Sequence, residues 1–372
     1  MGAVLTPEQQ EIRSTAGRFL EEKSTSESVR SLMESEPGFD ESTWKQMAEL
    51  GWLGITIPEE YGGLGLGFEE LAILLEEMGK HLLPAPFLSS AVMASRVVLH
   101  GGSEEQKAEI LPKIADGTTR ATVAFTEPSG RWSLEGVTLE AKQVDDGYAL
   151  EGSKMFVLDG HTANLVVVAA RGGENGSIVL LLVDPDDDTV ARKALDTLDG
   201  TRKQARIDFS GTKASLLGTD ESGAQALQRT LDESAVAIAA EAVGTAQACL
   251  DMATSYANTR IQFGRPIGSF QGIKHKCADM LIEVENARSA AFYGAWAAAR
   301  EPDELGIAAC VAKAYASDTV FDCAAKNIQI HGGIGFTWEH DAHLYFRRAK
   351  TQEIYLGDAS HHRALLMDRL GI

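Results

Sequence analysis

Glu241 is a carboxylic acid within an otherwise apolar run, Ile238-Ala239-Ala240-Glu241-Ala242-Val243-Gly244. Burial disfavours the charged form of a carboxyl group, so we expect the pKa of Glu241 to be raised. A raised pKa suits a general base that works near neutral pH. The same pattern is also typical of a structural glutamate that pairs with an Arg or Lys across a helical bundle, or of an interface residue. The sequence leaves both roles open.

The four cysteines have no spacing that is typical of a metal site or of a disulfide framework. Cys249, Cys277, Cys310 and Cys323 all lie in Ala-rich, helix-like segments. We therefore predict buried, reduced thiols, as in a cytoplasmic protein. No metal site is predicted, and the pair His361-His362 is expected to lie at the surface.

The charge balance excludes some classes of partner. The chain has 34 basic and 54 acidic residues, which gives a formal net charge of −20. Such a surface repels nucleic acid and anionic lipid, so we expect no nucleic-acid partner. We identify neither an uninterrupted apolar run of about 18 residues nor an N-terminal signal peptide, so we expect no membrane span and a cytoplasmic location.

Periodicity divides the 372 residues into three parts. Residues 5 to about 120 have apolar residues at helical spacing, starting after Thr6 as an N-cap. From about 121 to 217, β-branched runs such as Ile178–Val183 alternate with Asp-Gly and Gly-Gly turns, which predicts a β domain. Long helices return after about 225, over 231–258, 269–300 and 305–331. The predicted domains are therefore 1–120, 121–224 and 225–372.

Several segments in this order resemble signatures of the acyl-CoA dehydrogenase family. They are Ile57-Pro58-Glu59-Glu60-Tyr61-Gly62-Gly63, Thr126-Glu127-Pro128, Arg260-Ile261-Gln262-Phe263-Gly264, Gln329-Ile330-His331-Gly332-Gly333 and the C-terminal segment 329–363. The resemblance covers almost the whole chain. It implies an α+β, mainly α fold with an N-terminal helical domain, a central β-barrel and a C-terminal four-helix bundle.

The resemblance also implies FAD as the cofactor, with binding residues Arg260, Gln262, Phe263, Gln271, Gln329, Gly332 and Gly333. A guanidinium such as that of Arg260 suits the dianionic pyrophosphate. Gly332-Gly333 lets backbone N–H groups approach the adenosine-diphosphate half. In this family these segments contact the flavin of a neighbouring subunit, so an oligomer is implied. Alternatively, Arg260 is a solvated helix residue and the two glycines merely end a helix.

Two departures from the family pattern concern the flavin pocket of the chain's own β domain. After Thr126-Glu127-Pro128 the family has small residues, whereas this chain has Arg131 and Trp132. The family's Trp-containing segment that covers the isoalloxazine is here Phe156-Val157-Leu158, and Leu158 offers no hydroxyl. We predict that this pocket is empty or filled by side chains.

A further departure removes the usual base. The family's catalytic glutamate follows the Tyr of an I-Y-E-G-T loop, and here that position is Leu356 in Ile354-Tyr355-Leu356-Gly357-Asp358. Some members place the glutamate on the helix that opens the C-terminal domain. The matching position is Ser234, beside Glu233. Glu241 lies two helical turns beyond Ser234, on the same face.

The predicted function is FAD-dependent α,β-dehydrogenation of an acyl-CoA thioester, with later reoxidation by an electron-transfer flavoprotein. The half-degenerate site resembles those of actinobacterial α2β2 enzymes that act on steroid side-chain CoA thioesters. The leading hypothesis is therefore a subunit that shares its FAD site with a related partner chain. Two alternatives are a homo-oligomer that uses Glu241 as base and a catalytically inactive structural homologue.

Overall fold

The computed structural model describes residues 5–145, 147–172 and 176–372, which fold as two compact units. The first unit comprises the described residues of Met1–Ser31 with Phe68–Leu83 and Ala235–Ile372. The second comprises Leu32–Gly67 and Pro84–Ser234. Each unit thus joins segments that are far apart in the sequence. The three domain boundaries given above stay a prediction.

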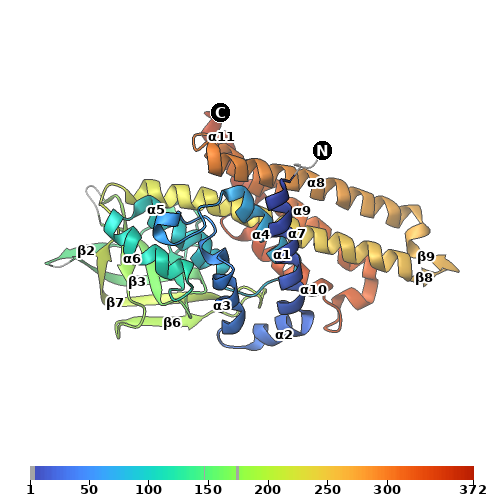
Figure 1. Ribbon diagram of the computed structural model, residues 1–372, viewed down its shortest axis with the longest axis horizontal. Helices are drawn as coiled ribbons and strands as arrows, with labels where there is room; N and C mark the ends of the chain where they lie inside the picture. Colours follow the sequence, from blue (N-terminus) through green and yellow to red (C-terminus); the bar gives the residue numbers. More distant parts are fainter. Residues whose placement is uncertain (1–4, 146, 173–175) are drawn as a thin grey trace. The chain divides into compact units, whose positions relative to one another are not determined.

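The second unit is built around a seven-stranded sheet with the strand order β1-β4-β5-β7-β3-β2, and β6 also pairs with β7 (Figure 1). β1 and β4 are parallel, whereas the other pairs are antiparallel. The strands are β1 Ala121–Ala124, β2 Ala141–Val144, β3 Gly147–Leu158, β4 Leu165–Arg171, β5 Ile178–Val183, β6 Val190–Ala194 and β7 Gln204–Leu216. β4 and β5 are buried along nearly their whole length, which explains their continuous β-branched and Leu-rich sequences.

Short helices accompany this sheet. They are α3 Glu41–Glu49, η1 Trp52–Gly54, η2 Glu59–Tyr61, the π-helix η3 Phe87–Ala94, α5 Ser95–Gly101, α6 Glu104–Ala115 and η4 Leu134–Gly136. η3 contacts β1, and all eight of its residues are buried. α6 begins with a capping box in which the Ser103 and Gln106 side chains satisfy each other's backbone N–H groups.

The first unit is a helical bundle in which α9 packs against α8, α10 and α11 (Figure 1). Its elements are α1 Pro7–Lys23, α4 Phe68–Lys80, β8 Ile261–Gln262, β9 Arg265–Pro266, η6 Ile267–Ser269, α8 Gln271–Arg300, α9 Leu305–His331, η7 Gly332–Phe336, α10 Ala342–Ile354 and α11 Ala359–Leu370. α2 Ser26–Glu34 and α7 Gly223–Thr259 contribute residues to both units. Alanine is the commonest residue at the buried positions of α9, which permits close helix packing.

Two glycines allow the backbones of α4 and α7 to cross closely within the first unit. A Cβ added to Gly79 would lie 2.0 Å from the carbonyl oxygen of Glu241, and one added to Gly244 would lie 1.8 Å from that of Glu76. Any larger residue would force the helices apart. This crossing fixes the position of the Glu241 backbone, from which its side chain extends.

The predicted fold class is confirmed: a helical N-terminal part precedes the sheet, and long helices follow it. The helix predicted over 305–331 has those bounds, while α7 begins eight residues before the predicted 231. α7 is long and apolar enough to cross a membrane by composition, but 83% of its most apolar window is buried inside the protein. It is therefore interpreted as a core helix.

Candidate functional site

The Thr126-Glu127-Pro128 loop is fastened to a β-bulge in β3 within the second unit. The pairing of β3 with β7 shifts between Lys154 and Val157, so Met155 and Phe156 together face one residue of β7. The Met155 N–H donates to the Thr126 carbonyl over 2.9 Å, and Phe156 has a left-handed backbone with φ of 57°. Bulges of this kind commonly re-aim a side chain next to a functional site.

A buried ion pair supports the same loop. Lys154 Nζ lies 2.7 Å from Glu127 Oε1 and donates to the Phe125 carbonyl at 3.2 Å. Desolvation lowers the pKa of Lys154 to about 8, although Glu127 opposes the shift. Desolvation alone would raise the pKa of Glu127, but Lys154 and the Thr138 and Leu139 donors leave it lowered. The loop is thus anchored by a charged pair.

Aromatic side chains crowd the pocket that the loop and the bulge would frame. The Trp132 ring centroid lies 6.1 Å from that of Phe125 and 6.4 Å from that of Phe156. Leu158 is buried and supplies no hydroxyl. One polar group does suit a ligand, because the buried Thr126 Oγ1 has no hydrogen-bond partner in the described part of the chain. This region therefore holds aromatic side chains and one unpartnered hydroxyl group, and its part in flavin binding stays a prediction.

The predicted phosphate-binding residues of the first unit are exposed to solvent. Arg260, Gln262 and Gln271 are exposed around the β8–β9 hairpin, and Phe263 at its tip is 92% exposed with a left-handed φ of 53°. Arg260 forms no ion pair among the residues that the structure describes. The Phe263 ring meets that of Phe270 edge-on, with centroids 6.1 Å apart, and is otherwise exposed. Holding a large aromatic residue in this conformation at an exposed hairpin tip is costly.

Gly332 and Gly333 begin η7 at the end of α9. Among the described residues, no atom lies within 4 Å of a Cβ built on either glycine, and Gly332 has a φ of 66°. Gln329 is exposed one turn earlier and accepts a hydrogen bond from Lys276 Nζ at 2.5 Å. The structure thus adds Lys276, which sequence reasoning missed, to the predicted group.

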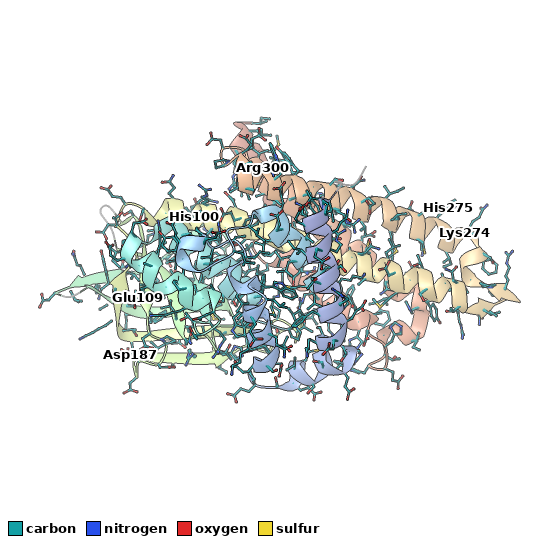
Figure 2. The ribbon with its side chains drawn as sticks, in the orientation of Figure 1. His100, Glu109, Asp187, Lys274, His275 and Arg300 are labelled. Carbon is teal, nitrogen blue, oxygen red and sulfur yellow. The ribbon has the colours of Figure 1, made fainter. Side chains whose placement is uncertain are left out.

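The chain is locally basic at this end of the bundle despite its net charge. No Asp or Glu occurs between Asp251 and Asp279, whereas Arg260, Arg265, Lys274 and Lys276 do. Figure 2 shows Lys274 and His275 near the start of α8, beside the hairpin. A cluster of cations beside glycine backbone with open space around it suits a dianion such as a pyrophosphate. These residues fit the phosphate half of FAD.

Glu241 has a cation beside it that the sequence alone did not reveal. Glu241 Oε1 lies 3.0 Å from Arg348 Nη1, and both side chains are buried. Arg348 also donates to the Leu83 carbonyl at 3.4 Å, which ties α10 to the end of α4. This arrangement matches the structural alternative stated for Glu241. Its role as a base stays a prediction.

The alternative base position on α7 holds no carboxyl group. The Ser234 hydroxyl donates to the Thr230 carbonyl one turn earlier, at 2.6 Å. Glu233 beside it is fully buried. Arg96 donates to it through Nε at 2.7 Å and Nη2 at 2.8 Å, and His100 Nε2 lies 2.8 Å from it. Desolvation alone would raise the pKa of Glu233, but the charge of Arg96 and the hydrogen bonds from Arg96 and His100 lower it to about 2. Such a carboxylate is a weak base.

The loop at the usual base position keeps an unusual shape. Leu356 is buried and has a left-handed backbone with φ of 60°, and Gly357 follows at 98°. His362 Nε2 lies 2.9 Å from the Leu356 carbonyl. The expectation of a surface location was wrong for His362, which is buried, because α11 turns it back towards this loop.

Other groups add little to the site. All four cysteines are free, and Cys277 is half-buried while the other three are buried. Within the described ranges, no group of three or more His, Cys, Asp or Glu side chains is placed to hold a metal ion.

Comparisons with known proteins match nearly the whole chain. Three family models match: Acyl-CoA dehydrogenase, N-terminal domain (residues 6–118), middle domain (122–212) and C-terminal domain (221–371). The acyl-CoA dehydrogenase IpdE2 of Mycolicibacterium smegmatis is 32% identical over 95% of this chain and 96% of its own length.

Two solved structures are also similar over nearly their full length. The first is a variant of the steroid ACAD Tcur3481–Tcur3483, 32% identical with a TM-score of 0.89, which covers 98% of each chain. The second is the ChsE4–ChsE5 complex from Mycobacterium tuberculosis, 28% identical with a TM-score of 0.91, which covers 100% of this chain and 99% of that one.

Fold, site and relatives together define an oxidoreductase that acts on CH–CH donors. The chain belongs to the acyl-CoA dehydrogenase family, whose members are FAD flavoproteins.

Proposed function

We propose that this chain is one subunit of a cytoplasmic hetero-oligomer, α2β2 in composition, that dehydrogenates an acyl-CoA thioester at an FAD site shared with a related chain. The observation that carries this proposal is Leu356, a buried hydrocarbon at the position of the family's usual base. A base must accept the α-proton of the thioester, and leucine cannot do so at any pH. The partner would therefore supply the carboxylate.

The contrast between the exposed phosphate-binding group and the crowded flavin pocket supports the same proposal. The exposed group around Arg260 and Gly332-Gly333 suits phosphates that belong to another chain, because these residues project from the bundle. The pocket beside Thr126 is crowded by Trp132 and Phe156. Two similar structures are complexes of two differently named chains, ChsE4–ChsE5 and Tcur3481–Tcur3483. Since the second is a steroid enzyme, we infer a steroid side-chain CoA thioester as the substrate class.

Within this assembly the chain's own residues bind and orient. Arg260 and Lys276 would neutralise pyrophosphate charge. Gly332 and Gly333 have no side chains, so the phosphates could approach the backbone closely, although the Gly332 N–H itself donates to the Ile328 carbonyl. FAD, when bound, accepts the hydride from the β-carbon of the acyl chain. An electron-transfer flavoprotein is the proposed acceptor of the electrons afterwards.

The chain purified alone is expected to bind little FAD, well below one flavin per chain. In its own pocket, position 158 is a leucine, which has no hydroxyl group, and Trp132 crowds the space. Few contacts would therefore hold the isoalloxazine. Flavin absorbance per chain measures this, for the chain alone and after co-expression with a related dehydrogenase chain. Yellow colour is expected only in the co-expressed sample. A ratio near one in a homo-oligomer of this chain would contradict the shared site.

Arg260→Ala is expected to weaken FAD retention in the assembled complex by about 10- to 100-fold, because a charge-assisted phosphate contact is worth about 1.5–3 kcal/mol. Flavin dissociation followed by absorbance gives the affinity. The matched control is Arg300→Ala, which removes the same charge at the other end of α8, where Arg300 pairs with Glu69 at 3.0 Å (Figure 2). Equal retention in both variants would remove the main support for a role of Arg260.

A second candidate function is a homo-oligomeric acyl-CoA dehydrogenase with Glu241 as base. The orphaned Thr126 hydroxyl favours it, since that group suits a ligand within the chain's own sheet unit. A homologue that is catalytically inactive and only stabilises a partner is a third candidate. The co-expression experiment separates them: the second predicts a yellow protein from the chain alone, and the third predicts a complex without turnover.

A further inference from the structure

Lys313 is a buried ammonium group that no role described so far uses. It lies in α9, and only 1% of the residue is exposed. Its Nζ donates to three oxygens: Ser317 Oγ at 2.9 Å, the Glu353 carbonyl at 3.0 Å and the Gly357 carbonyl at 2.7 Å. An ammonium group has three N–H donors and no acceptor, so the three oxygens saturate it. Lys313 is therefore buried with all of its hydrogen-bond donors satisfied.

The three acceptors place Lys313 next to the loop that carries the family's usual base. Glu353 belongs to the last turn of α10, whose terminal carbonyls have no partner within the helix. Gly357 follows Leu356, and both have left-handed backbones. Lys313 fixes the Gly357 carbonyl while His362 fixes the Leu356 carbonyl. Two consecutive carbonyls of the loop are thus held by two buried side chains from different helices.

This conformation is costly unless its surroundings impose it. A non-glycine residue in the left-handed region costs about 1–2 kcal/mol. Glycine suits position 357, because its φ of 98° is rarely adopted by other residues and a Cβ there would lie 2.2 Å from His361 Cδ2. Backbone strain of this kind persists where a site needs it. In this chain the loop adopts that conformation with leucine, not a carboxylate, at position 356.

We propose that Lys313 is a positioning residue of the acyl-CoA site: its ammonium group holds the Tyr355–Asp358 loop in its left-handed conformation, so that the backbone beside the substrate keeps its geometry without a carboxylate at 356. The placement of substrate at this loop rests on the proposed function. The clamp itself rests only on the contacts given above.

The charges around Lys313 make the clamp sensitive to pH. Desolvation lowers the pKa of Lys313 to about 7, while the charges of Asp358 and Glu353 oppose the shift. Desolvation and the charge of Lys313 lower the pKa of His362 to about 3, so His362 is neutral and donates through Nε2. The other charged groups facing this region from α11 are His361 and Arg369. Above about pH 7 Lys313 becomes an amine with two N–H donors, and one of its three acceptors loses its hydrogen bond.

Amide hydrogen exchange of residues 355–358 in the full chain tests the clamp directly. After correction for the intrinsic pH dependence of exchange, protection of the loop is expected to be at least about tenfold higher at pH 6 than at pH 8.5, since hydrogen bonds from a charged donor are the strong ones. In Lys313→Met, protection should fall to a low value that is the same at both pH values.

The matched control is Lys326→Met on the same helix. Lys326 pairs with Asp322 at 2.5 Å and touches no loop carbonyl, so its removal should leave the protection of the loop and its pH dependence unchanged. If the parent chain protects the loop equally at both pH values, or if Lys313→Met protects it as well as the parent does, the clamp is refuted. If Lys313→Met fails to fold, the comparison of the parent chain at the two pH values still tests the clamp.

Kinetics of the assembled enzyme test the link to substrate. Lys313→Met is expected to raise KM for acyl-CoA at least about tenfold at pH 6 with flavin content unchanged, whereas Lys326→Met should leave KM unchanged. An unchanged KM in Lys313→Met would refute the positioning role. A parent complex without any turnover would contradict the proposed function instead, because the exchange measurements need neither flavin nor partner.

Discussion

Glu241→Gln is expected to destabilise the helical bundle by about 3–5 kcal/mol while each folded, assembled enzyme turns over at nearly the parent rate. Glu241 and Arg348 form a buried ion pair at 3.0 Å, and removing one partner of such a pair leaves an uncompensated buried charge. Denaturant unfolding gives the stability, and kcat per bound flavin gives the turnover. This outcome would assign Glu241 a structural role and place the base on the partner chain.

The opposite outcome would make Glu241 the base. General-base catalysis contributes about 10²–10⁴-fold, so turnover would fall by that factor with flavin content and acyl-CoA binding intact. The double variant Glu241→Gln/Arg348→Met separates the two roles, because removing both partners of a buried pair restores much of the lost stability. If the double variant regains stability and turns over at nearly the parent rate, Glu241 is structural. If it regains stability alone, Glu241 is the base.

The sequence was sufficient for the fold because the patterns that specify it are local. The β-branched runs of β4 and β5 are buried, and the Ala-rich stretch of α9 is the central helix of the bundle. The start of α7 was placed too late because residues 223–230 include Gln225, Gln228 and Arg229, which interrupt the apolar pattern without interrupting the helix.

The site was harder to predict because its decisive contacts join residues far apart in the chain. The apolar neighbours of Glu241 left open whether it is a base or is paired with an Arg or Lys, because its partner Arg348 lies 107 positions away in the sequence. Lys313 reaches Gly357 and His362 reaches Leu356 only because α9, α10 and α11 pack together. A lysine in an otherwise Ala-rich helix face was a signal available in the sequence. It indicates a buried cation with partners, although not which ones.

Glu233→Gln is expected to destabilise the sheet unit by about 3–5 kcal/mol at pH 7, since it leaves the Arg96 guanidinium without its buried counter-charge. The matched control is Glu109→Gln in the same unit, labelled in Figure 2. Glu109 is exposed and pairs with Lys113 at 3.3 Å, so its removal should change stability by less than about 0.5 kcal/mol. Unfolding monitored by calorimetry at pH 7 compares the three proteins.

The acid sensitivity of the same unit provides the sharper test. The pKa of Glu233 is lowered from 4.5 to about 2, so the folded carboxylate resists protonation more than the unfolded one. Its contribution, about 3 kcal/mol, is fully present above pH 4.5 and is lost as pH falls towards 2. His100, whose pKa is lowered by burial, acts in the same direction below about pH 6.5. Between pH 5 and pH 3 the parent should therefore lose stability more steeply than Glu233→Gln, which has no carboxyl group to protonate. Parallel curves for the two proteins would mean that the Arg96–Glu233 pair contributes no net stability.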